Sequence, residues 1–179
     1  PREHCDLVVR RGGRRVDLDD LAVDDGEARR ELERRVAVED ALAAAREAEQ
    51  AGEVPVGAVI VRDGIIIATA RNRVEGDQDP SAHAELLAIR EATAKTGSKW
   101  LHDCDLYVTL EPCPMCAGAI SLARLRRLYY GAPDPKSGGV DHGPRVFSQP
   151  TCHHAPEVIA GVEESRCGEV LKRFFAQRR

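Results

Sequence analysis

Two short stretches contain the residue types from which a metal site can be built. His83 and Glu85 lie in one stretch, and Cys113 and Cys116 lie in the other. Cysteines three residues apart lie on the same face of a helix. The prolines on either side of Cys113 suit a helix start, where the first N–H groups have no partner within the helix. A helix start favours thiolate over thiol, and a bound cation does so more strongly.

One imidazole and two thiolates form a donor set that suits tetrahedral Zn²⁺ at distances of about 2.0 to 2.3 Å. We therefore predict one Zn²⁺ per chain, bound by His83, Cys113 and Cys116, with water as the fourth ligand. Glu85 follows the imidazole by two residues, and we predict that it takes a proton from this water, whose pKa the metal lowers toward about 7. The alternative is a structural zinc with a fourth side chain from Cys104, His102 or Cys152.

Composition restricts the class of protein. The chain has 179 residues, enough for one domain with a full core, and a net charge of -4. Its pI of about 5.9 gives no overall basic character, so contact with nucleic acid requires a local basic patch. No apolar run approaches the ~18 residues of a membrane span, and the charged start lacks the apolar core of a signal peptide. We expect a cytoplasmic protein without membrane association.

The cysteines are not expected to form disulfides. Cys113 and Cys116 are too close in a helical frame for an easy bridge, and Cys-x-x-Cys in an intracellular enzyme more often serves metal or redox chemistry. The other cysteines are predicted to be plain thiols, namely Cys5, Cys104, Cys152 and Cys167.

The hydrophobic pattern indicates an α/β domain over residues 25–179, preceded by an arm over residues 1–24. The arm is dense in arginine and aspartate, and we predict that it is appended and mostly disordered. The first predicted elements are a helix at 25–51, strands at 54–61 and 65–70, and a hairpin turn at Asp63–Gly64. Because these strands are apolar throughout, we expect a sheet that is covered on both faces.

Strand and helix alternate along the rest of the chain. The predicted elements are a helix capped by residues 79–81 and ending near 95, a strand at 105–110, a helix at 113–124, a strand at 127–130, a loop at 132–149, a short strand at 157–159 and a helix at 163–177. This alternation indicates parallel pairing with right-handed crossovers. In such sheets the functional groups lie at strand ends and helix starts.

Residues 79–85 and 106–119 resemble the zinc-binding signature of the cytidine deaminase superfamily, specifically that of bacterial tRNA adenosine deaminases. Further stretches of the chain are similar to that branch, namely 53–58, 72–73, 130–138, 156–159 and 174–175. The resemblance covers roughly residues 37–179.

The resemblance implies a three-layer αβα fold with a mixed five-stranded sheet, and a homodimer with its sites near the subunit interface. It implies that Glu85 is the proton shuttle. It also implies that the nucleoside is held at Val56, the backbone of Ala58, Asn72, His83 and Ala84. From its residue type alone, Asn72 can also be a loop residue that tolerates left-handed backbone.

The chain departs from this branch at two places. Residues 139–149 replace a shorter stretch of small residues, and His153-His154-Ala155 stands where the family has Asn-His-Arg. Both departures fall where tRNA adenosine deaminases contact the anticodon loop. The loop that carries Phe147 is long enough to cover a small substrate, which favours a free base. Cys152, His153 and His154 also have the residue types of a second metal site, although the family has no metal there.

Three functions are therefore considered. The first is hydrolytic deamination of adenosine to inosine at the anticodon wobble position of tRNA, in which zinc hydroxide attacks C6. The second is deamination of a free purine or cytosine-type nucleobase or nucleoside, and the third is a non-catalytic zinc-binding partner subunit. Glu85 argues against the third, because a structural subunit needs no shuttle carboxylate. We predict the first, because the similarity outside the zinc signature is to the tRNA branch.

Overall fold

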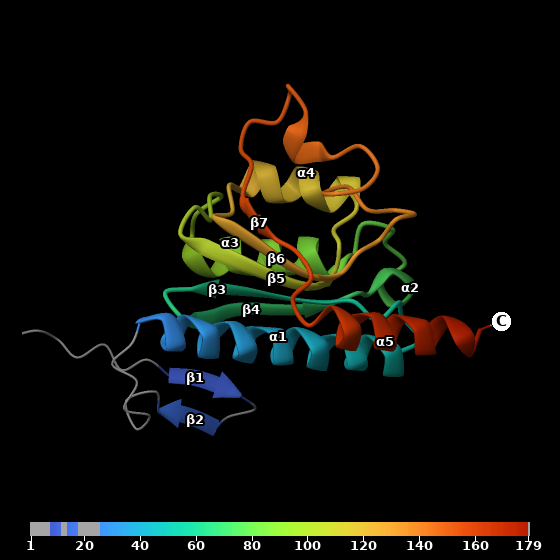
Figure 1. Cartoon of the computed structure of the whole chain (residues 1–179), viewed down its shortest axis with the longest axis horizontal. Helices are drawn as coiled ribbons and strands as arrows, with labels where there is room; N and C mark the ends of the chain where they lie inside the picture. Colours follow the sequence, from blue (N-terminus) through green and yellow to red (C-terminus); the bar gives the residue numbers. More distant parts are fainter. Residues whose placement is uncertain (1–7, 12–13, 18–25, 179) are drawn as a thin grey trace, which may run out of the picture.

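A computed structural model of the chain describes residues 8–11, 14–17 and 26–178 (Figure 1). The helices are α1 (Gly26–Gln50), α2 (Val74–Asp77), α3 (Ala84–Thr96), α4 (Pro114–Ala123) and α5 (Glu164–Ala176), with a short 3-10 helix η2 (Val146–Ser148). The strands are β1 (Val8–Arg11), β2 (Arg14–Asp17), β3 (Gly57–Arg62), β4 (Ile65–Arg71), β5 (Cys104–Leu110), β6 (Arg127–Ala132) and β7 (Glu157–Ile159).

The main sheet has five strands in the order β4-β3-β5-β6-β7. Strand β3 pairs antiparallel with both β4 and β5, whereas β5–β6 and β6–β7 are parallel. The predicted turn between β3 and β4 is present. Asp63 and Gly64 both have positive φ, of 50° and 75°, which is the backbone that a two-residue hairpin of this hand needs. The mixed five-stranded sheet is confirmed.

Helices cover both faces of this sheet, as the apolar strands predicted (Figure 1). On one face α1 and α5 pack against Val59, Tyr107 and Tyr129. On the other face α3 and α4 pack against a second core that includes Ile60, Leu106 and the fully buried Leu128. The molecule is therefore the expected three-layer αβα structure. Among the described residues, no helix has both the length and the apolar character that a membrane span requires.

Helix α3 begins later than predicted. Its N-cap is His83, which has extended backbone at φ -74° and ψ 148°. Asp79 does not cap the helix. It closes a turn just before it, because its Oδ1 accepts hydrogen bonds from the Ser81 amide at 2.8 Å and the Ser81 hydroxyl at 2.7 Å. This turn leaves His83, rather than a conventional capping side chain, at the mouth of the helix.

The segment predicted to be a mostly disordered arm contains a short hairpin. Strands β1 and β2 pair antiparallel, with Val9 opposite Val16, and β1 lies near α1 and β4. These eight residues, VVRR and RRVD, pair as strands, whereas the expectation that the arm as a whole is appended and mostly disordered stays a prediction. The other residues of 1–24 lie outside the described part of the chain, so the domain boundary at residue 24 stays a prediction.

Helix α1 sits directly on the start of β3, where Gly57 leaves no room for a side chain. A Cβ at this position would lie 2.0 Å from the Ala41 carbonyl oxygen and 2.6 Å from the Ala45 amide nitrogen. Both atoms belong to the backbone of α1, so they cannot rotate away. The small residue at position 57 therefore sets the distance between α1 and the sheet.

We predict that Gly57→Ala lowers the free energy of unfolding by at least about 1–3 kcal/mol, the usual cost of overpacking a core. Urea denaturation followed by circular dichroism measures this change. Gly168→Ala is the matched control, because a Cβ at Gly168 of α5 meets nothing within 4 Å. Equal stability of the two variants would contradict the close approach of α1.

Candidate metal centre and active site

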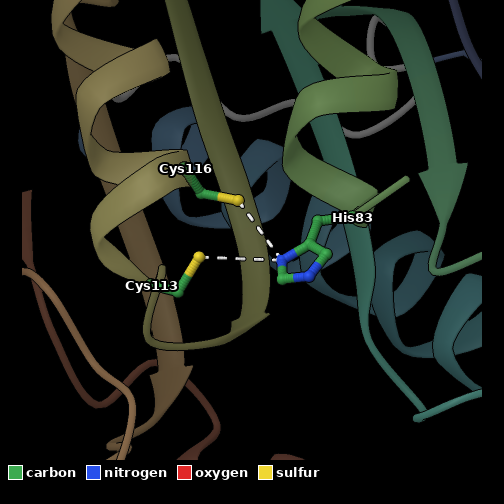
Figure 2. A group of neighbouring side chains, drawn as sticks. All are labelled: His83, Cys113 and Cys116. Atoms are coloured by element: carbon green, nitrogen blue, oxygen red, sulfur yellow. Dashed lines mark hydrogen bonds between the residues drawn. The ribbon is translucent and has the colours of Figure 1, made fainter. Parts of the chain in front are cut away.

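The predicted metal ligands come from the starts of two helices. His83 is the N-cap of α3, and Cys113 is the N-cap of α4, with φ -67° and ψ 169°. Cys116 lies in the first turn of α4 and is buried. Strand β5 ends at Leu110 and α4 begins at Pro114. The cysteines at the start of α4 therefore lie at the end of β5, next to the imidazole of His83. Figure 2 shows the three side chains pointing toward one another.

The distances fit a single tetrahedral metal. His83 Nδ1 lies 3.7 Å from Cys113 Sγ and 3.5 Å from Cys116 Sγ. For Zn²⁺ with the usual bond lengths, nitrogen and sulfur ligands are about 3.5 Å apart. Within the described ranges, this is the only group of three or more His, Cys, Asp or Glu ligand atoms that all lie within 4.8 Å of one another. The residues therefore fit zinc, and no fourth described side chain completes a closed site.

The two thiols differ in acidity. The hydrogen bond from Cys116 and a second one from His83 lower the pKa of Cys113 to about 4. The pKa of Cys116 is raised well above its usual range, because its proton is held by Cys113 and because the thiol is buried. Hydrogen bonding to Cys113 also raises the pKa of His83. Without a cation the cluster retains protons that zinc displaces, so metal binding and thiol deprotonation are coupled.

Glu85 lies beside the ligands and is only 4% exposed. Burial raises its pKa, and this outweighs the lowering by its own backbone amide and by His83. A carboxyl with a raised pKa holds and releases a proton closer to neutral pH than an exposed one. Its position and its acidity both suit proton transfer.

A cavity of about 580 Å³ opens beside this cluster. This volume lies within the usual range for small-molecule sites. His83, Glu85 and Cys113 line it, so the metal centre faces the cavity. The remaining lining residues are Gly52, Glu53, Val54, Val56, Asn72, Val74, Glu75, Leu110, Glu111, Asp134, Ser137 and Arg178.

Comparisons with known proteins agree with this geometry. Residues 33–179 match the family model of the MafB19-like deaminases. The chain belongs to this deaminase family. It is 55% identical over 147 residues to a tRNA-specific adenosine deaminase of Agrobacterium fabrum, covering 82% of this chain and 97% of that protein.

Two solved structures share the fold of this deaminase. One comes from a study of A-to-I editing by tRNA:A34 deaminases at the wobble position. It is 56% identical, with a TM-score of 0.75 and coverage of 75% of this chain and 98% of that chain. The other is a guanine deaminase from Bacillus subtilis. It is 36% identical, with a TM-score of 0.56 and coverage of 80% of this chain and 92% of that chain.

The predicted substrate residues of the deaminase fall into two groups. Asn72 and Val56 line the cavity together with His83. Ala58 and Ala84 are fully buried in the core and do not line it. Contact between their backbone and a substrate stays a prediction, whereas a side-chain role for them is not supported.

The loop predicted as a cover does not lie over the cavity. None of its residues from 139 to 149 is among those that line the cavity. Val146 and Phe147 instead pack against the core on the α4 side of the sheet. The cover interpretation is therefore wrong, because this loop buries its apolar residues against the domain rather than over the active site.

The Cys152–His154 stretch is bound to protein groups and not to a metal cluster. His154 Nε2 lies 2.6 Å from the Leu125 carbonyl oxygen, and Cys152 Sγ lies 3.4 Å from the Ser121 hydroxyl. Within the described ranges these residues join no metal-binding group. All cysteines in the described part of the chain are free thiols, as predicted.

Sequence reasoning gave no role to Glu53 or Glu111, yet both are buried and line the cavity. Glu53 accepts hydrogen bonds from Asn72 Nδ2 at 3.2 Å and from the amides of Glu75 at 3.2 Å and Gly76 at 2.7 Å. The carboxylate therefore fixes which end of the Asn72 amide faces it. No sequence motif identifies such a glutamate, because its burial depends on residues that are distant in sequence and pack around it in the fold.

We predict that Glu85→Gln retains one zinc per chain but lowers turnover by about 10²- to 10⁴-fold, the usual contribution of general acid–base catalysis. Elemental analysis measures the zinc, and ammonia release measures turnover. Glu91→Gln is the control, because Glu91 lies on the same helix and pairs at the surface with Lys95 at 2.6 Å. Turnover of Glu85→Gln within a few-fold of wild type would refute the shuttle role, and metal-free wild-type protein would refute the zinc site.

Proposed function

We propose that this deaminase converts adenosine to inosine in the anticodon loop of tRNA, in the cytoplasm. The observation that carries the proposal is the 55% identity to a tRNA-specific adenosine deaminase, which extends over 97% of that relative. The metal ligands, Glu85 and the cavity-lining residues all fall within residues 33–179, which match the deaminase family model. The same chemistry on free guanine, as in the more distant Bacillus subtilis relative, is the competing function.

The reaction adds water across the bond between C6 and N1 of the base, with oxygen on C6 and a proton on N1, and then releases ammonia from C6. Zinc, when bound, supplies a Lewis acid that brings the pKa of water toward about 7. Glu85 is within the cavity and buried, so it can accept a proton from the attacking water without competition from solvent. It can deliver this proton to N1, and then carry the proton of the new C6 hydroxyl to the leaving amino group as the bond from C6 to that nitrogen breaks.

Asn72 supports recognition of the base. Its side-chain nitrogen donates to Glu53 at 3.2 Å, which holds the amide in one orientation at the cavity wall. A base that enters this cavity therefore meets a fixed arrangement of one carbonyl oxygen and one remaining N–H. Such preorganised polar groups give orientation at little entropic cost.

Arg178 supports a polymeric substrate. It is the only lysine or arginine among the described residues that line the cavity. Its guanidinium stacks 3.9 Å from the centre of the Phe174 ring and donates to the Gly52 carbonyl oxygen at 2.7 Å. Among the described residues it has no carboxylate partner, so several N–H donors stay available. A guanidinium held in this way at a cavity suits a phosphate next to the extruded nucleotide.

We predict strong turnover of an anticodon stem-loop, and little or none of free adenosine, adenine, guanine or cytosine. Arg178→Ala should lower kcat/KM on the stem-loop about tenfold, the usual value of one charged hydrogen bond, and leave any residual activity on free adenosine unchanged. Ammonia release measures both.

Arg173→Ala is the control for Arg178→Ala. Arg173 also lies on α5, but it pairs with Glu49 at 2.6 Å and does not line the cavity. Efficient turnover of a free base with none on the RNA would overturn the proposed function. An equal loss on RNA and on adenosine in Arg178→Ala would reject only the phosphate contact.

We further propose that two copies of the chain form a homodimer through α4. Met115, Gly118 and Leu122 recur at helical spacing on the outer side of this helix. Met115 is 41% exposed and Leu122 is 72% exposed. A row of apolar and small residues that faces outward allows close packing of a second helix. The same helix carries two of the metal ligands, so a dimer formed here places the partner beside the active site.

We predict that the wild-type chain sediments as a dimer and that Leu122→Glu sediments as a monomer, because an unpaired charge in an apolar interface is strongly unfavourable. Analytical ultracentrifugation measures this. Glu91→Gln again serves as a surface control. A monomeric wild type, or a dimeric Leu122→Glu, would rule out this interface.

A further inference from the structure

Glu111 has the most saturated carboxylate in the described part of the chain. Its side chain is fully buried although it follows directly after β5. One oxygen, Oε1, accepts the amides of Val140 at 3.2 Å, Asp141 at 2.9 Å and His142 at 3.0 Å. The other oxygen, Oε2, accepts the Asp134 amide at 2.9 Å and lies 2.6 Å from His142 Nδ1. Both oxygens are therefore fully used.

All of these donors come from a single loop, residues 134–142. The loop is wrapped closely around the carboxylate. A Cβ on Gly138 would lie 2.5 Å from the carboxyl group of Glu111. The loop is also tied to β6, because the Tyr130 hydroxyl donates to the Asp141 carboxylate. One buried charge thus determines the path of this loop.

The same loop rests on the backbone that carries Cys113. The Gly139 amide donates to the Pro112 carbonyl oxygen at 2.8 Å. A Cβ on Gly139 would lie 2.6 Å from the nitrogen of Pro114 and 2.9 Å from the carbonyl carbon of Cys113. No side-chain hydrogen bond caps α4 at Cys113. The loop is therefore a main support of this helix start.

We propose that Glu111 is a positioning residue for the metal centre, which acts through the loop 134–142 to hold Cys113 in place as a zinc ligand. The proposal requires the zinc site but does not depend on which substrate is deaminated. It gives the long loop of this chain a role in place of the rejected cover. Groups that orient metal ligands typically change metal affinity by 10- to 100-fold when they are removed.

The test is the rate at which the zinc-loaded full chain releases its metal to a chromophoric chelator. Glu111→Gln keeps the shape of the side chain. In the native protein both carboxylate oxygens accept backbone N–H donors, so the amide NH₂ of the glutamine faces such a donor in either orientation. Gly139→Ala leaves Glu111 intact and displaces the loop from Pro114. Both variants should release zinc at least about tenfold faster than wild type.

Asp105→Asn is the matched control. Asp105 is also buried, at 7% exposed, and lies at the opposite end of the same strand, where Arg126 binds it at 2.8 Å and 2.9 Å. It should lose stability on heating but release zinc at the wild-type rate. Wild-type release by both Glu111→Gln and Gly139→Ala would overturn the proposal, and so would faster release by Asp105→Asn at equal loss of thermal stability. If Glu111→Gln does not fold, the zinc release rate of Gly139→Ala alone tests the proposal.

Discussion

The active site depends on the convergence of two helix starts at one edge of the sheet. Two sulfurs and one imidazole nitrogen lie within 4.8 Å of one another, and only a cation allows both sulfurs to be thiolates at that distance. The positive ends of α3 and α4 help, since His83 and Cys113 are their N-caps. The pairing of β5 with β3 and β6 brings these helices to the same face of the sheet. The metal site is thus a direct consequence of strand order.

Three buried glutamates line the cavity, and their surroundings indicate which of them have a structural role and which one transfers protons. Glu53 and Glu111 accept several N–H donors each. Hydrogen bonds from the amides of Asp134 and His142 lower the pKa of Glu111 despite its burial. For Glu85 burial has the larger effect, and its pKa is raised. Glu111 stays charged and holds backbone in place, whereas Glu85 can exchange a proton.

Much of the fold and the metal site could be predicted from local patterns. The alternation of apolar strands and helices is encoded residue by residue, and Cys113 and Cys116 are close because they are three apart in a helix. His83 was predicted as the third ligand from its donor type, because one imidazole and two thiolates suit tetrahedral Zn²⁺, and the resemblance to known deaminases supported it. Sequence does not show on which side a long loop packs, so the loop at 139–149 was misplaced. That choice depends on Glu111, whose donors are 23 to 31 residues away along the chain.

The charges that line the substrate side of the cavity determine how a polyanion can bind there. The chain has a net charge of -4, and Glu53, Glu75 and Asp134 line the cavity together with a single guanidinium, that of Arg178. Long-range attraction therefore cannot be the main source of affinity for a polyanion such as RNA. Among the described residues that line the cavity, one guanidinium can contact phosphate, so contacts inside the cavity contribute only a shallow dependence of binding on salt, since each phosphate contact contributes its own counterion release. The cavity therefore adds affinity for RNA mainly by burying the extruded base against Asn72 and the metal centre, which places recognition and catalysis in the same cavity.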